Sequence, residues 1–372
     1  MASELETQAA RLFTVGFHGQ TVSADLNLLL RRGVSGVVVF SRNVGEPAEV
    51  AATTLAIKLA AGRPIVIALD QEGGKVQRLR RGFSELPTMR ALGETRSAPL
   101  AREVGALIGR ELRAVGFDLN YAPVLDIDTN PDNPVIGSRS FARTPELVSE
   151  LAIALAQGLE SVGIAACGKH FPGHGDTQQD SHLALPRLSH SLQRLQQVEL
   201  RPFAAAVEAG IPALMTAHVV FEPLDPLYPA TMSRAVLHRL LREQLRYDGL
   251  VVTDDLEMRA IADHYAVEET VVRGLDAGVD QFLCCHTAEL AHRAIDAVIH
   301  AVESGTVSRE QLATANRRIQ SFGARYARPA CAAPDLSVLR CDAHLALLDR
   351  VSRGAAGADP TAVMSRVVVE RG

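Results

Sequence analysis

The stretch VGIAACGKHFPGHGDTQQDSH, residues 162–182, joins a short apolar run to a loop that is rich in titratable side chains. The apolar run at its start, VGIAAC, predicts a buried β-strand. The loop from Lys169 onward carries one ammonium group, three imidazoles and two carboxylates. It also contains Phe171 and Pro172, which a purely solvated loop would not favour. Because loops that follow buried strands hold the active sites of α/β proteins, this stretch predicts a strand whose carboxyl end opens into a functional loop.

Apolar runs of strand length recur along the chain and alternate with longer amphipathic segments. This alternation predicts an α/β fold, a single (β/α)8 barrel of TIM type in which each parallel strand is followed by a helix. A doubly wound sheet is the competing architecture, but no GxGxxG motif opens a helix after the first strand. The expected strands are residues 13–17, 36–40, 65–69, 119–125, 163–167, 213–218, 250–253 and 281–285, and the expected helices include residues 49–61, 101–115, 145–161, 191–209, 234–244 and 267–277.

The chain changes character near residue 327, where the Pro- and Ala-rich run ARPACAAPDLS begins. We expect residues 1–326 to form the catalytic barrel and residues 327–372 to form a small C-terminal extension packed on it. One further helical pattern covers residues 341–353, and we expect the end of the chain to be a mobile tail.

The composition is that of a globular protein with a sizeable core. Of 372 residues 47% are hydrophobic, and 38 basic against 43 acidic side chains leave a net charge of −5. Nucleic-acid binding needs clustered Lys and Arg with stacking aromatics, whereas this chain has no tryptophan and five tyrosines. No apolar run approaches the roughly 20 residues that span a bilayer. We therefore expect neither a nucleic-acid partner nor a membrane partner.

The N-terminus and the cysteines favour a cytoplasmic protein. The chain opens with MASELETQAARLFTVGF, which is acidic and lacks the basic and apolar regions of a signal peptide. The five cysteines are irregularly spaced, and Cys284 and Cys285 are adjacent within an apolar run. This pattern favours reduced core thiols over a disulfide framework. We expect a monomer or a weak dimer.

Polar side chains follow the ends of five consecutive expected strands. In a (β/α)8 barrel these ends gather on one rim, which is the face that carries active sites. A single acid after a strand would mean little, but a set from five strands indicates a shared site. The residues are Asp70 after the third strand, Asp126 and Asp128 after the fourth, Lys169 and His170 after the fifth, His218 after the sixth, and Asp254 and Asp255 after the seventh.

Carboxylates, imidazoles and a lysine on one rim suit more than one reaction. Glycoside hydrolysis would use Asp254 as nucleophile and a general acid/base from the loop. Schiff-base chemistry would use Lys169, although a lysine among acids is poorly placed to lose its proton. A non-enzymatic binding barrel is a further alternative. Metal-dependent hydrolysis would use a ligand set of His170, His174, Asp176, Asp180 and His182, but barrel metallohydrolases usually spread their ligands over several strands.

Several motifs of the chain together resemble glycoside hydrolase family 3. They are ALDQEGGKVQRL (68–79), NPVIGSRSF (133–141), KHFPGHGDTQQDSH followed by LALP (169–186), MTAHVVF (215–221) and VVTDDLEM (251–258). Within the family, the resemblance is to bacterial cytoplasmic β-N-acetylhexosaminidases, the β-N-acetylglucosaminidases of peptidoglycan recycling. It implies a retaining exo-glycosidase that uses no cofactor and removes terminal non-reducing β-linked N-acetylglucosamine, with muropeptide fragments as the expected substrates.

The resemblance also implies roles for individual residues. Asp254 matches the family's catalytic nucleophile, and His182 matches its histidine general acid/base, with Asp180 as the partner of that histidine. A histidine with a pKa near ~6.5 can donate and accept a proton near neutrality. The neighbouring Asp255 has a weaker claim than Asp254. The residues expected to bind the sugar are Asp70, Arg78, Arg139, Lys169 and His170, and no metal ligand is expected.

The sequence leaves two features of the reaction open. The aglycone could be a muropeptide fragment, a chitobiose unit or another β-N-acetylglucosaminide group. Phosphorolysis also stays open beside hydrolysis, because a histidine acid/base tolerates an incoming phosphate anion better than a carboxylate would.

Overall fold

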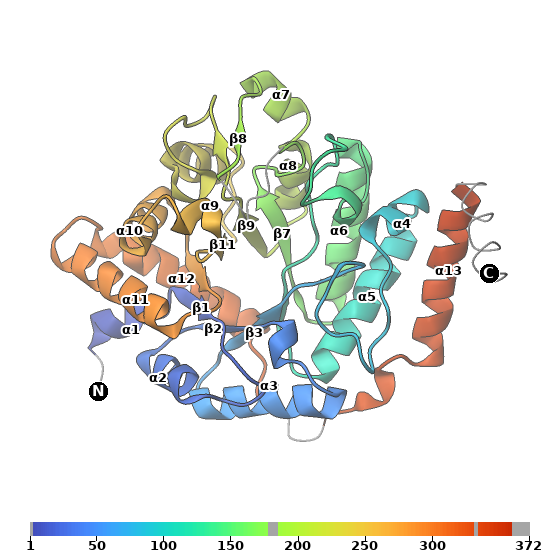
Figure 1. The fold of residues 1–372 in the computed structure, drawn as a ribbon, viewed down its shortest axis with the longest axis horizontal. Coiled ribbons are helices and arrows are strands. Elements are labelled where there is room, and N and C mark those ends of the chain that lie inside the picture. The colour runs from blue at the N-terminus through green and yellow to red at the C-terminus, as the bar shows by residue number, and fades with distance from the viewer. Residues whose placement is uncertain (1–2, 178–184, 331–333, 359–372) are drawn as a thin grey trace.

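Eight parallel strands close into a barrel in the computed structural model, which describes residues 3–177, 185–330 and 334–358 (Figure 1). Around the barrel the strands follow the order β1-β12-β11-β9-β7-β6-β3-β2. The predicted (β/α)8 architecture is confirmed, and each expected strand position holds a strand. The barrel strands are β1 (Phe13–Val15), β2 (Gly36–Val39), β3 (Val66–Leu69), β6 (Leu119–Asn120), β7 (Ala165–Phe171), β9 (Ala213–Thr216), β11 (Leu250–Asp255) and β12 (Gln281–Cys284).

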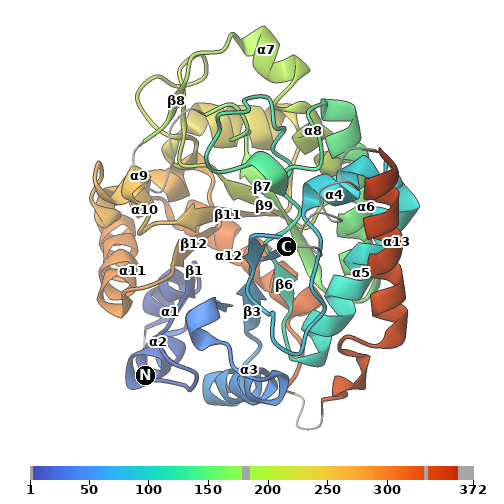
Figure 2. The same cartoon turned by 45° about the vertical axis from the view of Figure 1, so that its right-hand side comes forward.

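A ring of helices surrounds the barrel, as Figure 2 shows from a second direction. Their inward faces are apolar, as in α5, where Leu100, Val104 and Leu107 are buried. Ser97 caps this helix because its side chain accepts the N–H of Leu100. The ring consists of α2 (Ala24–Arg32), α3 (Pro47–Ala61), α5 (Ala98–Ala114), α6 (Pro145–Ser161), α8 (Arg201–Glu208), the π-helix η4 (Ala235–Gln244), α10 (Val267–Ala277) and α11 (Ala288–Glu303).

The helix expected over residues 191–209 is divided in two. It forms α7 (Leu192–Gln197) and α8, with Val198, Glu199 and Leu200 between them. Pro202 in the first turn of α8 cannot continue a preceding helix, because its nitrogen has no hydrogen to donate. The break also allows the Glu199 side chain to be buried, where Arg194 donates two hydrogen bonds to it.

Strand β7 extends beyond the expected residues 163–167 and ends at Phe171. Its register with β9 shifts between Gly168 and Phe171, but the pairing resumes at Phe171, so the strand extends to that residue. Lys169 and His170 therefore lie on the strand itself, where the barrel holds their backbone, rather than on the loop after it.

Short elements lengthen the loops at the carboxyl ends of the strands, and two helices cover the amino ends. Arg318 of α12 pairs with Asp248 and Asp280, which precede β11 and β12. Helix α12 (Arg309–Tyr326) also contacts α1 (Glu4–Ala10). The short elements are β4 (Gln71–Gly73), β5 (Val76–Gln77), β8 (Arg187–Leu188), β10 (Val220–Phe221), α4 (Met89–Glu94), α9 (Arg259–Ala262), η1 (Ser41–Asn43), η2 (Gly137–Arg139) and η3 (Ala230–Met232).

Beyond residue 327 the described chain forms η5 (Leu336–Val338) and α13 (Asp342–Ala358). Helix α13 contacts α4 and α5, as Figure 2 shows, and Leu347 and Val351 are buried. The expected mobile tail lies outside the described residues. Within the described residues, no helix is both long enough and apolar enough to cross a membrane.

Candidate active site

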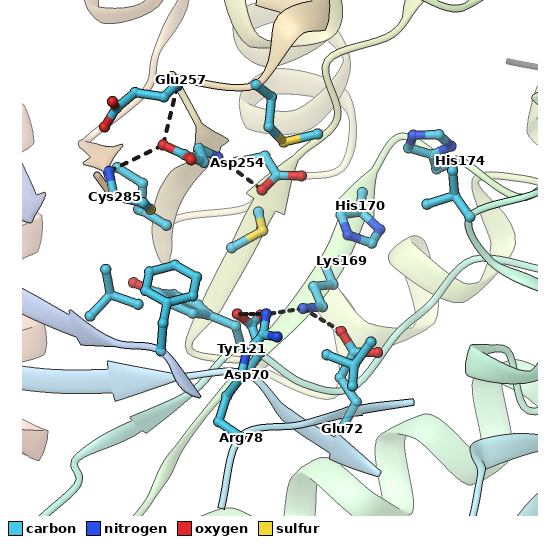
Figure 3. Close-up of a pocket in the computed structure, with 18 of the residues that line it drawn as sticks. Asp70, Glu72, Arg78, Tyr121, Lys169, His170, His174, Asp254, Glu257 and Cys285 are labelled. Atoms are coloured by element: carbon cyan, nitrogen blue, oxygen red, sulfur yellow. Dashed lines mark hydrogen bonds and ion pairs between the residues drawn. The ribbon is translucent and has the colours of Figure 1, made fainter. Parts of the chain in front are cut away.

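A cavity of about 440 Å³ opens at the carboxyl end of the barrel (Figure 3). Its wall combines charged side chains with apolar ones such as Phe40, Tyr121 and Met215. The expected nucleophile and the whole expected sugar-binding set line this cavity, namely Asp254, Asp70, Arg78, Arg139, Lys169 and His170. The expected acid/base residues Asp180 and His182 lie outside the described part of the chain.

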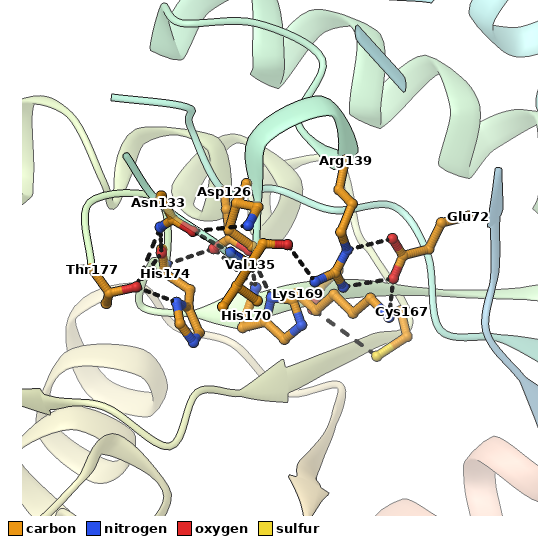
Figure 4. Close-up of polar contacts among 12 residues, drawn as sticks. Glu72, Asp126, Asn133, Val135, Arg139, Cys167, Lys169, His170, His174 and Thr177 are labelled. Atoms are coloured by element: carbon orange, nitrogen blue, oxygen red, sulfur yellow. Dashed lines mark hydrogen bonds and ion pairs between the residues drawn. The ribbon is translucent and has the colours of Figure 1, made fainter. Parts of the chain in front are cut away.

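Lys169 is the centre of a buried charge network on one side of the cavity (Figures 3 and 4). Its Nζ donates to Asp70 Oδ1 at 2.7 Å and lies 2.6 Å from Glu72 Oε1. Arg78 Nη2 donates to Asp70 Oδ2 at 3.1 Å. Arg139 binds Glu72 through Nε and Nη2, each at 2.8 Å. Opposite charges alternate along the network, so each group is fixed by its neighbours.

The network keeps its members ionised. Burial would raise the pKa of the Asp70 carboxyl, but Lys169 and Arg78 outweigh burial and lower the pKa. Burial would also raise the pKa of Glu72, but Arg139 and Lys169 outweigh burial and lower it. Burial would lower the pKa of Lys169, but the two carboxylates raise it. Because Schiff-base formation needs the free amine, a lysine that keeps its proton argues against that alternative.

Glu72 is a site residue that sequence reasoning missed. Its side chain is 1% exposed, and both of its carboxylate oxygens bind cationic groups. The available signal was a second acid two residues after Asp70 in the motif ALDQEGG. That signal is weak, because spacing alone does not tell that Glu72, on β4, points back at Lys169.

Asp254 lies at the end of β11 with the cavity between it and Lys169 (Figure 3). Its Oδ1 accepts the backbone N–H of Asp255 at 2.8 Å. Burial would raise the pKa of Asp254, but His170 and that N–H lower it. The carboxylate is therefore ionised in a setting where an unpaired acid would otherwise take up a proton.

Asp255 is occupied by structural contacts. Its Oδ1 accepts the backbone N–H groups of Glu257 at 3.1 Å and of Cys285 at 3.2 Å. Its Oδ2 is 3.2 Å from His286 Nε2, and this hydrogen bond raises the pKa of His286. Both oxygens are thus engaged in holding the loops after β11 and β12.

His218 supports the end of β11 from the neighbouring strand. Its Nε2 is 3.0 Å from the carbonyl oxygen of Asp255, and its Nδ1 is 2.8 Å from Thr231 Oγ1. A carbonyl only accepts, so Nε2 carries the hydrogen. Burial lowers the pKa of His218, which favours the neutral ring. His218 thereby fixes the backbone beside Asp254.

Asp126 orients His170 (Figure 4). Its Oδ2 is 2.6 Å from His170 Nδ1, and the carboxylate also accepts the backbone N–H groups of His170 and His174. Burial would raise the pKa of Asp126, but His170 lowers it, so the ring donates from Nδ1 to an ionised acid. The nitrogen that can serve the cavity is then Nε2. Asp128 instead pairs with Arg90 at 2.6 Å, away from the cavity lining.

The described start of the loop after β7 is closely packed. A Cβ added to Gly175 would lie 1.7 Å from the carbonyl oxygen of Ile127, and Gly173 has φ +136°. His174 Nδ1 is 2.9 Å from Thr177 Oγ1 (Figure 4). Burial lowers the pKa of His174 to about 4, so this ring is neutral near pH 7.

Residues 4–322 match the family model described as the glycosyl hydrolase family 3 N terminal domain. The chain belongs to glycosyl hydrolase family 3. A β-hexosaminidase from Thiobacillus denitrificans is 44% identical over 268 residues, which cover 70% of this chain and 74% of that protein. A family 3 β-N-acetylglucosaminidase from Paenibacillus sp. str. FPU-7 has a TM-score of 0.93 at 43% identity, over 95% of this chain and 69% of that one. NagZ from Neisseria gonorrhoeae, in complex with N-trifluoroacetyl-D-glucosamine, has a TM-score of 0.77 at 31% identity, over 92% and 98% of the two chains.

As a family 3 glycosyl hydrolase, the protein is an enzyme that acts on carbohydrate, and the metal-dependent alternative is not favoured. One ligand of the set considered for that alternative, His170, is instead held by Asp126 through its Nδ1.

Proposed function

We propose that the protein is a retaining exo-β-N-acetylglucosaminidase in which Asp254 is the nucleophile and His182, oriented by Asp180, is the general acid/base. The observation that carries the proposal is the ionised, half-buried Asp254 at the end of a barrel strand, facing a cavity whose other side is lined by fixed charges. A nucleophile held by the barrel can be aimed accurately at the anomeric carbon. Asp255 fits this role less well, since both of its oxygens are already bound.

The reaction takes two steps. Asp254 attacks C1 of the sugar while the protonated His182 donates its proton to the departing oxygen, which gives a covalent glycosyl-enzyme. The neutral His182 then removes a proton from water, which attacks C1 and releases Asp254. Asp180 would accept the other ring N–H and so fix the tautomer and stabilise the imidazolium.

The cavity supports recognition of a single terminal sugar. Its volume of about 440 Å³ lies near the small end of the range for ligand sites, ~300–1,000 Å³. Lys169, Arg78 and Asp70 offer charge-assisted hydrogen bonds to sugar hydroxyls, and Arg139 and His170 complete the expected binding set. The names of the relatives support N-acetylglucosamine as that sugar and hydrolysis over phosphorolysis. We infer muropeptide fragments as substrates, the cytoplasm as the location, and a monomer or weak dimer as the working form.

Covalent trapping tests the assignment. A fluorinated, slowly turned-over N-acetylglucosaminide with a good leaving group should label Asp254, as peptide mass spectrometry would detect, and the released sugar of a normal substrate should keep the β-configuration. Asp254→Ala should lose turnover and labelling while keeping its unfolding transition. Labelling of Asp255, or release of the α-anomer, would refute the proposal.

A further inference from the structure

Three potential metal ligands meet beside the base of the loop after β7. They are Asp176 on that loop, His190 just before α7, and Glu199 between α7 and α8. One ligand atom from each lies within 4.8 Å of the other two. His190 Nε2 and Asp176 Oδ2 are in direct contact. Two carboxylates and one imidazole thus converge from three separate segments.

Glu199 shows that this cluster is more than a surface salt bridge. Its side chain is 3% exposed, and its Oε1 accepts two hydrogen bonds from Arg194, at 3.2 Å from Nε and 3.0 Å from Nη2. Its Oε2 is buried and has no hydrogen-bond partner in the described structure. A buried carboxylate oxygen without a donor carries an uncompensated desolvation penalty. A cation bound there would remove that penalty.

We propose that Asp176, His190 and Glu199 form a binding site for a divalent transition-metal ion of the zinc class. One imidazole with two carboxylates is a ligand set that zinc accepts, whereas calcium and magnesium prefer oxygen ligands alone. Zinc bonds of about 2.0–2.2 Å require ligand atoms roughly 3–4 Å apart, so the side chains need only small movements. Arg194 would act as an outer partner that orients Glu199, as hydrogen-bonded carboxylates do around metals.

The site is separate from the cavity that contains Asp254, since none of its three ligands lines that cavity. Asp176 precedes and His190 follows residues 180–182, so an ion held by both would join the two ends of that segment. An effect of the bound ion on catalysis would depend on the proposed roles of Asp180 and His182. Binding of the ion itself does not depend on those roles. The proposed reaction routes no step through the ion.

Zinc titration of the full chain tests the site. After dialysis against a chelator, calorimetric titration of the wild type with zinc chloride should show binding of one equivalent at this site. His190→Ala and Glu199→Gln should each weaken that binding at least about 100-fold, because each removes a direct ligand. His238→Ala is the matched control: His238 is an exposed histidine that contacts Glu243, and its loss should leave zinc affinity unchanged.

A further variant excludes the acid/base pair as the zinc site. His182→Ala should keep the zinc affinity of the wild type while losing activity on natural substrates. Thermal unfolding of each protein should be compared with and without zinc, and only variants that keep all three ligands should be stabilised by zinc. Unchanged affinity in His190→Ala, or loss of binding in His182→Ala, would overturn the proposal. Neither result would bear on Asp254 labelling, so the two proposals fail separately.

Discussion

At the scale of single residues, Glu72 holds in place the charges that we propose to bind the sugar. It is the shared partner of Lys169 and Arg139 and has almost no contact with solvent. Glu72→Gln keeps the shape but removes the charge, and removing one partner of a buried ion pair typically costs about 3–5 kcal/mol. We expect the free energy of unfolding at pH 7 to fall by about that amount in a urea titration. We also expect kcat/KM to fall at least about 10-fold, because Lys169 loses its fixed position.

The stability loss in Glu72→Gln should depend on pH in a defined direction. Burial alone would raise the pKa of Glu72, but Arg139 and Lys169 outweigh burial and lower this pKa in the folded state. In the unfolded chain the pKa of a glutamate is about 4.3. A lowered carboxyl pKa adds stability above the unfolded value, and that stability is lost as the pH falls through the folded value. The difference in stability between wild type and variant should thus be constant above about pH 5.5 and shrink below about pH 4. A difference that grows towards acid pH would contradict an ionised Glu72.

The proposed proton donor has a distinct kinetic signature. A good leaving group departs without a proton, so the acid matters most for poor leaving groups. His182→Ala should therefore slow cleavage of a natural disaccharide far more than glycosyl-enzyme formation from an activated aryl glycoside. Asp180→Asn should show the same pattern in milder form, because the imidazole stays but loses its orienting charge. Stopped-flow and steady-state rates on both substrates would measure this, and equal slowing on both would place the proton donor elsewhere.

At the scale of elements, the start of the loop after β7 is positioned by close backbone packing. A Cβ at Gly175 would lie 1.7 Å from the carbonyl oxygen of Ile127, which belongs to the loop after β6. Gly175→Ala must therefore move the loop after β7 away from the loop after β6. Misplacing catalytic groups by about 1 Å can cost ~100-fold in rate, and we expect kcat/KM to fall by at least about 10-fold. Gly323→Ala is the control: a Cβ there meets nothing within 4 Å in helix α12, and alanine should be neutral or stabilise by up to about 1 kcal/mol. Unchanged kinetics in Gly175→Ala would show that the loop tolerates the shift.

At the scale of the whole molecule, the sequence predicted the barrel and grouped the six expected site residues that line its cavity for a simple reason. Buried parallel strands are short apolar runs, and the barrel brings their carboxyl ends to one rim. Asp70, Lys169 and Asp254 could be grouped from their positions after such runs, without knowledge of any contact.

What the sequence could not predict depends on contacts between segments that are distant in the chain. Glu72 pairs with Arg139, but nothing in the sequence of either motif indicates that the two residues are in contact. The break between α7 and α8 depends on Pro202 and on a burial site for Glu199. The spacing of apolar residues, from which the helix was predicted, contains no information on either. The cluster of Asp176, His190 and Glu199 has the same character, because its three ligands follow no metal-binding spacing.

The division between barrel and C-terminal extension remains a prediction that one pair of variants can test. Val351 of α13 is fully buried in a helix that packs on α4 and α5, whereas the next residue, Ser352, is exposed. Val351→Asp places an unpaired charge in that contact and should lower the free energy of unfolding by about 3 kcal/mol or more, while Ser352→Asp should change it by less than about 0.5 kcal/mol. Because the cavity is built by the barrel strands and their loops, kcat/KM at 25 °C should stay within about twofold of wild type in both. Calorimetry and steady-state kinetics would measure these quantities. A large loss of kcat/KM in a still-folded Val351→Asp protein would mean that the extension helps to shape the active site.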